Sequence, residues 1–454
     1  MQLLMSMVNK AIDLRVGISN KQILKLALPI SASIIVPQLN FIINNIFLGS
    51  ISQQALAVAG ITGVFYLIFA VIGNGFNTGL QSLIARKAGK NEIPAIASLL
   101  SNGISIAIIT SCFGIAFTYF LAPSILKATL KDTSNVQMAV DFLRIRIWGL
   151  PLLYLYQLRN ALLVGVNQSK FLIIGTAAEA VSNVFFDYVL IYGKLGFPVL
   201  GFLGAAYASI IAEAVGLISI FFVIRNNSML KQITDFEGWR IDVEQIKLIF
   251  KQSLPLVLQF AISIISWEFF YILIEHHGQL DLAVSNTMRN IFGFFGCFTW
   301  AFASTTNTMV SNVIGQGLQE KVMELIYKII RLSVLFAIII CILLNVFPHV
   351  FLSIYAQDEA FIQAGIPVLR IISVGLIVMS VSVVWTNAVI ATGNTKVNLQ
   401  IELVTIILYC VYVYVVLEVL FLSITWGWAS ELIYWTSLLI PSYWYIKSGK
   451  WKTR

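Results

Sequence analysis

Long apolar runs separated by short polar segments follow one another along the whole chain. A transmembrane helix needs about 20 mainly apolar residues to cross roughly 30 Å of hydrocarbon, and twelve segments reach that length. They lack the apolar–polar alternation of barrel strands. The sequence therefore predicts an all-α polytopic membrane protein with twelve transmembrane helices. The expected spans are 23–48, 55–79, 96–121, 140–164, 170–192, 203–225, 248–274, 282–308, 327–348, 363–391, 397–420 and 425–446.

The spans divide into two halves of six. A long polar stretch predicts an N-terminal lobe over 1–225, a cytoplasmic linker over 226–247 and a C-terminal lobe over 248–454. Residues recur between the halves at an offset of 226 or 227, and six crossings per half give both the same orientation. This is a parallel pseudo-symmetric repeat, typical of alternating-access carriers. The matching pairs are Pro29/Pro255, Gln53/Gln279, Leu56/Leu282, Ala57/Ala283, Val58/Val284, Gly89/Gly315, Asn160/Asn387 and Asn167/Asn394.

The ends of the second and eighth spans are moderately amphipathic. Residues 80–91 and 310–321 each contain a glycine near their end. We interpret both segments as short helices lying at the cytoplasmic membrane surface, with a solvated loop as the alternative.

Composition and charge support a membrane location. Hydrophobic residues make up 59% of the chain and charged residues 11%, whereas soluble domains average about 25% charged residues. The net charge of +8 is a topology signal, because 21 of the 29 Lys and Arg fall on one side of the predicted spans and three on the other. The positive-inside rule then places both termini in the cytoplasm. We expect a multi-pass protein of the inner or plasma membrane that does not bind nucleic acid.

The fifth span carries the densest set of intramembrane polar residues. Glu179, Asn183 and Asp187 are spaced by four, which places them on one helix face. Ionisable groups inside a membrane are costly and mark functional sites by default. Because low dielectric disfavours the charged form of a carboxyl group, Asp187 could take up a proton on one side and release it on the other. The alternative is that Asp187 pairs with an Arg or caps its helix.

Further polar residues lie in other spans. Pro29 and Pro37 are eight residues apart in the first span and can bend it. Asn40 and Asn44 share a face of that span, where buried amides either cross-link helices or bind a ligand. Glu213 adds an acid in the sixth span. Arg144, Arg146, Arg159 and Arg370 lie nearer span ends, where a structural role is favoured.

In the second half, four residues form a candidate C-lobe polar site. These are Glu268, Arg289, Asn387 and Glu402. A structural Glu268–Arg289 ion pair between neighbouring helices is favoured over a functional role for these two residues.

Enzymatic and metal chemistry find little support. His276 and His277 adjoin Glu275 in an outer loop without a second cluster, so a solvated turn is favoured over a metal site. The sequence contains no phosphate-binding loop, catalytic triad spacing or metal-ligand motif. We expect no enzyme, no metal and no cofactor other than a transported coupling ion.

Several segments together resemble the multidrug and toxic compound extrusion (MATE) transporters, over essentially the whole chain. They are the first span with Pro29, NNIFLGSISQQALA from Asn44, NVFFDYVLIYG from Asn183, GFLGAAYASIIAE from Gly201 and SNVIGQG from Ser311. The resemblance implies twelve helices in two six-helix lobes, and efflux of organic, often cationic, compounds driven by H⁺ or Na⁺. We expect a monomer that works in the lipid bilayer on a small-molecule substrate.

One departure from the family pattern changes the expected site. The family usually has an Asp at the position of Asn44, which cannot titrate. Ion coupling would then fall mainly to Asp187, with Asn44, Glu179, Asn183 and Glu213 lining the same cavity. Places where some members carry acids in the seventh and tenth spans hold Ser263 and residues near Val381. The alternative function is a flippase for a lipid-linked saccharide or other lipid-like cargo, which would use cationic residues such as Arg289.

Overall fold

The protein is helical throughout the part that the computed structural model describes, residues 13–130, 132–235, 241–355 and 358–452. No β-strand occurs in these ranges, so the all-α prediction is confirmed. The first half contains α2 (Asn20–Ile51), α3 (Gln53–Gly89), α4 (Ile93–Thr129), α5 (Thr133–Arg146), α6 (Leu150–Gly165), α7 (Leu172–Tyr192), α8 (Phe202–Asn226) and α9 (Ser228–Thr234). The second half contains α10 (Val243–Glu275), α11 (Gln279–Gly315), α12 (Val322–Val346), α13 (Pro348–Ser353), α14 (Glu359–Ala391), α15 (Thr395–Tyr414), the π-helix η4 (Val415–Val419), α16 (Ile424–Trp428) and α17 (Ser430–Lys447).

Nine helical segments among the described residues are long and apolar enough to cross a membrane. The other three predicted spans are helical as well. Span 140–164 falls on α5 and α6, which a 3₁₀ turn at Ile147–Gly149 joins, and span 425–446 falls on α16 and α17. Span 282–308 lies within α11, whose C-terminal part is rich in Ser, Thr and Asn. These polar residues face another helix rather than lipid.

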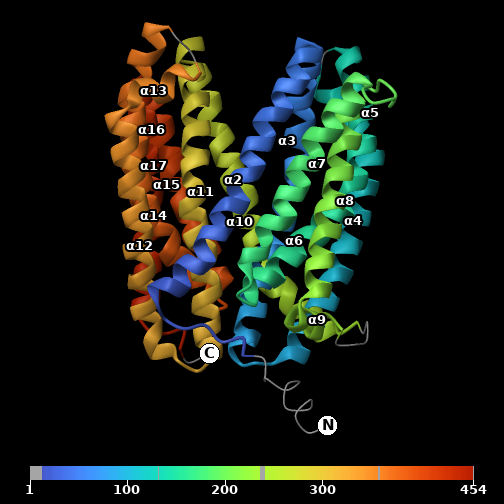
Figure 1. The fold of residues 1–454 in the computed structure, drawn as a ribbon. Helices are drawn as coiled ribbons and strands as arrows, with labels where there is room; N and C mark the ends of the chain where they lie inside the picture. The colour runs from blue at the N-terminus through green and yellow to red at the C-terminus, as the bar shows by residue number, and fades with distance from the viewer. Residues whose placement is uncertain (1–12, 131, 236–240, 356–357, 453–454) are drawn as a thin grey trace.

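The helices form two bundles that lie side by side and diverge toward one end (Figure 1). Helices α3 to α8 make one bundle and α11 to α17 the other. The first helix of each half crosses over: α2 packs on α11 as well as on α7, and α10 packs on α3 as well as on α15. The exact limits of the lobes and linker stay a prediction; α9 and the first residues of α10 occupy the region expected for the linker.

The repeat extends to contacts that follow from the two matching prolines. Pro29 and Pro255 lack an N–H, so each leaves the carbonyl four residues earlier without its helical partner. Ser169 Oγ lies 3.4 Å from the Lys25 carbonyl oxygen and 3.2 Å from that of Leu26. In the second half, Thr395 Oγ1 lies 3.5 Å from the Lys251 carbonyl oxygen. The two hydroxyl groups are 226 residues apart, and so are the two carbonyl groups of Lys25 and Lys251. Each half therefore places a hydroxyl group at the equivalent position beside the carbonyl that its proline leaves free.

The two lobes meet where α3 and α11 end. Gly89 packs so closely that an added Cβ would lie 2.0 Å from the Asn312 carbonyl oxygen, and one on Gly315 would lie 2.1 Å from that of Arg86. Polar contacts continue the joint: Gln81 Nε2 donates to Thr308 Oγ1 at 2.8 Å. The prediction of separate surface helices over 80–91 and 310–321 is therefore wrong. These segments largely continue α3 and α11, and their small residues face the other lobe instead of the membrane surface.

The residues before α2 strap across this joint. The backbone N–H of Leu14 donates to Asn91 Oδ1 in the first lobe at 2.9 Å, and that of Val16 donates to Asn312 Oδ1 in the second at 3.1 Å. At the other end of the described chain, Lys452 Nζ lies 2.9 Å from Glu320 Oε1. Both ends of the described chain thus lie on the closed side of the molecule, which we call the termini side.

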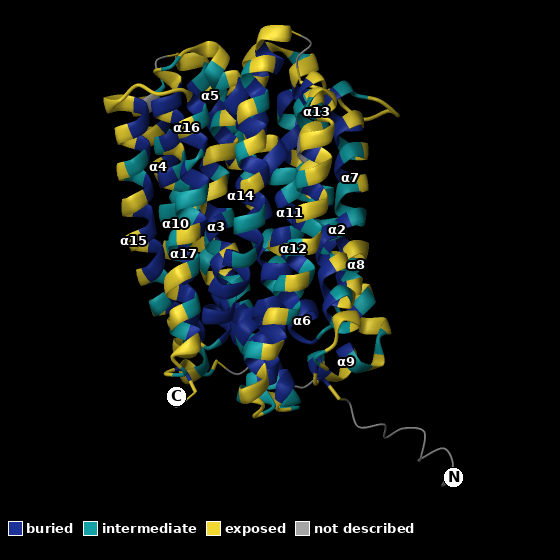
Figure 2. Cartoon of the chain, turned by 90° about the vertical axis from the view of Figure 1, so that its left-hand side faces the viewer, coloured by how far each residue is buried: buried dark blue, intermediate teal, exposed yellow. Residues whose placement is uncertain are grey.

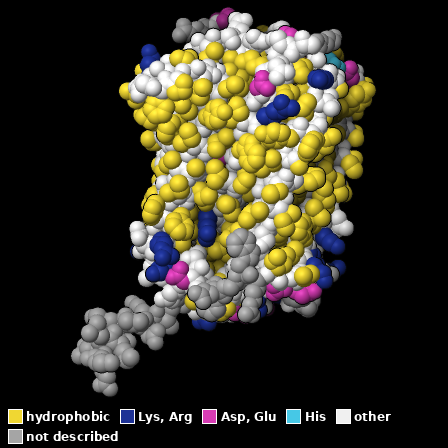
Figure 3. All heavy atoms as spheres, turned by 90° about the vertical axis from the view of Figure 1, so that its right-hand side faces the viewer, with side chains coloured by type: hydrophobic (Ala, Val, Ile, Leu, Met, Phe, Trp, Pro, Cys, Tyr) yellow, Lys and Arg dark blue, Asp and Glu magenta, His cyan; other side chains and the backbone are white. Residues whose placement is uncertain are grey.

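The surface matches a lipid environment. Exposed residues lie on the outward faces of the helices, whereas buried ones face the bundle interiors (Figure 2). Figure 3 shows hydrophobic side chains over the middle of one face, with Lys and Arg mostly toward its two ends. Large exposed apolar side chains such as Ile109, Phe120 and Val181 belong to this surface. A continuous apolar surface of this extent is typical of membrane contact.

The glycine contact predicts a specific sensitivity. Gly89→Ala adds a methyl group against the backbone of α11, so α3 and α11 must move apart, at a cost of about 1–3 kcal/mol. We expect a lower melting temperature for the purified protein. Gly60→Ala is the matched control on the same helix, because a Cβ there meets no atom within 4 Å. Equal melting temperatures for the two variants would contradict the close contact.

Candidate functional site

Helices α2 and α7 bring four polar side chains together. Asn40 and Asn44 lie one turn apart on α2, and Asn183 and Asp187 lie one turn apart on α7. The Nδ2 atoms of Asn40 and Asn44 donate to Asn183 Oδ1 at 2.7 and 2.9 Å. With the Asn44 amide turned over, its nitrogen lies 2.7 Å from Asp187 Oδ2. We call these four residues the Asp187 cluster.

The Asp187 cluster combines two buried residues on α7 with two half-buried ones on α2, and its hydrogen bonding is incomplete. Asp187 is 1% exposed, and no Lys, Arg or His in the described ranges forms an ion pair with it. Asp187 Oδ1 and Asn40 Oδ1 also have no hydrogen-bond partner there. An unpaired buried carboxylate costs several kcal/mol unless it is neutralised. Carboxylate and amide oxygens are ligands that hard cations prefer, so this arrangement can hold a proton or a small cation.

The other two acids predicted for this cavity lie in a second cluster. Glu179 is eight residues before Asp187, about 12 Å along the axis of α7, and its side chain packs against Gly216 of α8. Glu213 of α8 accepts two hydrogen bonds from Arg146, at 2.5 and 3.1 Å. The structure therefore divides the predicted set between two clusters.

Arg146 has a defined role in the second cluster. Its guanidinium lies 4.0 Å from the centre of the Tyr66 ring and forms a two-point ion pair with Glu213. Both side chains of the pair are largely buried. A planar guanidinium suits such two-point recognition of a carboxylate. Sequence reasoning placed Arg146 near a span end and missed this partner, because the two residues are 67 positions apart.

The structure does not gather the four predicted residues of the second half into one site. Glu268 is exposed, and no ion pair joins it to Arg289 among the described residues. Arg289 instead lies 5.1 Å from the Tyr271 ring centre. Asn387 donates to the Val383 carbonyl oxygen of its own helix. Glu402 is buried among other partners, which are described below.

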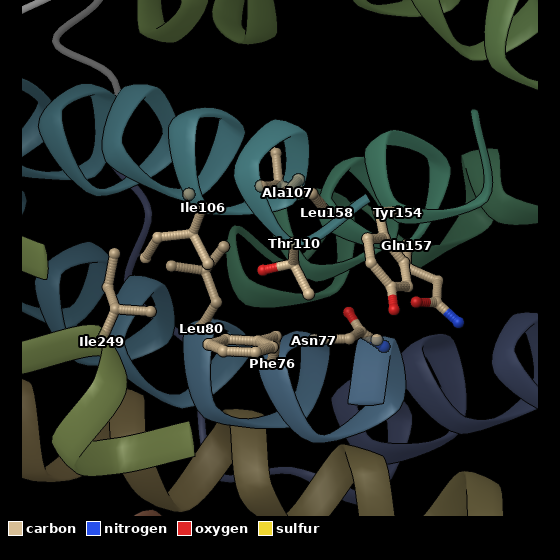
Figure 4. Close-up of a pocket in the computed structure, with 12 residues that line it drawn as sticks. Phe76, Asn77, Leu80, Ile106, Ala107, Thr110, Tyr154, Gln157, Leu158 and Ile249 are labelled. Atoms are coloured by element: carbon tan, nitrogen blue, oxygen red, sulfur yellow. The ribbon is translucent and has the colours of Figure 1, made fainter. Parts of the chain in front are cut away.

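A separate pocket lies inside the first lobe (Figure 4). It is lined mainly by apolar side chains of α3, α4 and α6, with Ile249 of α10 at one end. Asn77, Thr110 and Gln157 contribute its polar atoms. None of its lining residues belongs to the Asp187 cluster. The free space inside it, about 30 Å³, is on the scale of a water molecule rather than of an organic compound.

Comparison with known proteins identifies the repeat as a family feature. The MatE family model matches residues 29–189 and 255–415, two segments whose starts and ends are both 226 residues apart. A probable multidrug resistance protein NorM from Thermotoga maritima is 24% identical over 440 residues, which cover 96% of this chain and 93% of that protein. A probable NorM from Mannheimia succiniciproducens is 21% identical over 389 residues, covering 85% and 83%.

Solved structures share the fold. A crystal structure of MATE in complex with MaL6 superposes with a TM-score of 0.87 at 17% identity, covering 96% of this chain and 98% of that one. A MOP superfamily transporter from Pyrococcus furiosus, described as having a binding pocket of reverse polarity, gives a TM-score of 0.86 at 18% identity, covering 96% and 97%. At these identities the likeness shows the fold alone, and it confirms the two-lobe architecture expected from the sequence.

The buried ion pair predicts non-additive effects on stability. Arg146→Met leaves Glu213 buried without its cation, which costs about 3–5 kcal/mol. We expect a large drop in melting temperature that the second change Glu213→Gln largely reverses. Arg144→Met, at an exposed position on the same helix, serves as the control and should change little. Additive losses in the double variant would show that the two side chains do not interact.

Proposed function

The chain belongs to the MatE family, and we propose that it exports small organic molecules through the cell membrane in exchange for protons or sodium. The observation that carries this proposal is the Asp187 cluster, a buried carboxylate with no basic partner among the described residues. Such a group must bind a proton or a cation to remain in a low-dielectric environment. The names of the curated relatives, multidrug resistance proteins, support efflux as the direction.

The proposed mechanism is alternating access by the two lobes. The termini side is cytoplasmic, in keeping with the excess of Lys and Arg there. In the present conformation the joint between α3 and α11 seals that side, and the lobes diverge toward the outside. Binding of the coupling ion at Asp187 then competes with cargo and favours its release outside. The reverse movement requires Gly89 and Gly315 to separate.

The proposed cargo is an organic cation. Asp187 presents an unneutralised carboxylate, whereas Arg146 is already paired with Glu213 and Arg289 lies over the Tyr271 ring. This distribution favours cationic cargo over a lipid-linked saccharide. We further propose that the protein acts as a monomer in the plasma membrane, with both termini in the cytoplasm.

The test is gradient-driven transport in proteoliposomes. A fluorescent organic cation such as ethidium is followed under an imposed proton gradient and, separately, a sodium gradient. We expect transport under one gradient, and its loss in Asp187→Asn, because an amide cannot exchange a proton and lacks the negative charge that neutralises a bound cation. Asp141→Asn is the control, since Asp141 accepts hydrogen bonds from Gln137 at the outer part of α5. Wild-type rates in Asp187→Asn would overturn the assignment.

A further inference from the structure

A second buried acid lies in the other lobe, in a setting unlike that of Asp187. Glu402 of α15 is 1% exposed. Ser263 Oγ of α10 lies 2.7 Å from its Oε1, and Gln259 Nε2 donates to its Oε2 at 3.1 Å. The hydroxyl of Tyr434 on α17 also donates to Oε1. Three helices thus converge on one carboxyl group.

No basic group neutralises this carboxyl. Within the described ranges, Glu402 forms no ion pair with Lys, Arg or His. The groups that face it are neutral ones, Ser263 and Gln259 from α10 and Tyr434 from α17, and Glu431 lies beyond Tyr434. Helix α14 contributes no charged group to it, and Glu418 of η4 pairs with His276 instead.

The Ser263 hydroxyl can serve both protonation states of Glu402. It has one hydrogen and two acceptors in reach, Glu402 Oε1 at 2.7 Å and the Gln259 carbonyl oxygen at 2.8 Å. When Glu402 is charged, Ser263 donates to it. When Glu402 is protonated, its new O–H donates to Ser263 Oγ, and the Ser263 hydrogen turns to the carbonyl. Either state is hydrogen-bonded without movement of a heavy atom.

The Gln259 amide is fixed in the matching orientation. Asn398 Nδ2 donates to Gln259 Oε1 at 2.6 Å, which leaves the Gln259 nitrogen facing Glu402. Asn398 is itself 2% exposed, and its Oδ1 has no partner in the described part of the chain. The site therefore keeps an unused buried acceptor beside a carboxyl group.

The other buried glutamates contact groups that can only donate. Glu431 accepts from Trp435 Nε1 at 2.9 Å and Trp267 Nε1 at 3.4 Å, and Glu213 accepts from Arg146. Indole and guanidinium groups have no acceptor to offer a protonated carboxyl. Such partners bond only the charged form of Glu213 and Glu431, whereas the hydroxyl groups around Glu402 can bond both its charged and its protonated form.

We propose that Glu402 is a proton-binding site of the C-terminal lobe, with Ser263 as its positioning residue. The reaction is the binding of one proton to the carboxylate and its later release, with no other bond made or broken. Proton binding is a property of the isolated protein, and only its use as a second coupling site rests on the proposed antiport.

The test is infrared difference spectroscopy of the purified full-length protein in lipid nanodiscs during a pH titration without cargo. The C=O stretch of a protonated buried carboxyl should disappear as pH rises, and Glu402→Gln should remove one such band while leaving that of Asp187. Size-exclusion profiles and melting temperatures check that the variant folds.

Ser263→Ala and its neighbour Ser266→Ala form the decisive pair. Loss of a hydrogen bond to the charged form should make the Glu402 band persist to a pH about one to two units higher in Ser263→Ala. The hydroxyl of Ser266 donates to the Ser263 carbonyl instead of to Glu402. Ser266→Ala should therefore leave the pH midpoint of the Glu402 band unchanged.

Each other outcome overturns the proposal. A Glu402 band that is present, or absent, at every pH rules out proton exchange. A band that responds to sodium instead of pH shows that Glu402 binds a metal cation. Equal midpoints in the two serine variants show that Ser263 does not position the proton. Because no transport is measured, failure here leaves the antiport proposal standing. Wild-type transport rates in Asp187→Asn, which would overturn the role of Asp187, likewise leave the assignment of Glu402 standing.

Discussion

The close packing of α3 on α11 is the constraint on which the arrangement of the molecule depends. Backbone meets backbone at Gly89 and Gly315, and side chains such as Gln81 and Thr308 extend the contact with hydrogen bonds. The strap formed by Leu14 and Val16 crosses the same joint. Because the lobes are joined tightly on the termini side, they diverge toward the other side. An alternating movement must exchange this joint for one at the opposite end.

Buried charge is distributed in a similar way in the two lobes. Each lobe has an acid whose partners can only donate, Glu213 beside Arg146 and Glu431 beside two indoles. Each also has an acid with neutral partners, Asp187 among asparagine amides and Glu402 among hydroxyl and amide groups. Since burying a charge without compensation is expensive, Glu213 suits permanent charge because Arg146 neutralises it, whereas Asp187 and Glu402 suit reversible neutralisation.

The local sequence pattern predicted much of the fold but less of the functional site. Apolar run length predicted the helices, and the offset of 226 anticipated a repeat that reaches the Ser169 and Thr395 hydroxyls. The spacing of four along α7 predicted that Asn183 and Asp187 share one helix face, which the structure confirms. The same spacing would have found Gln259 with Ser263, and Asn398 with Glu402. It could not show that these two pairs meet, because they are 139 residues apart. The surface helices were misjudged for a related reason, since Gly89 and Gly315 meet only across the lobes.

The central claim is that an ion bound at Asp187 governs the relative position of the lobes. Spin labels at Lys90 and Glu320, exposed positions of the two lobes on the termini side, report that position as a distance distribution in nanodiscs. A change of pH or sodium concentration should shift the distribution between short and long distances in the wild type and leave it constant in Asp187→Asn. The same shift in both proteins, or no shift in either, would contradict the claim.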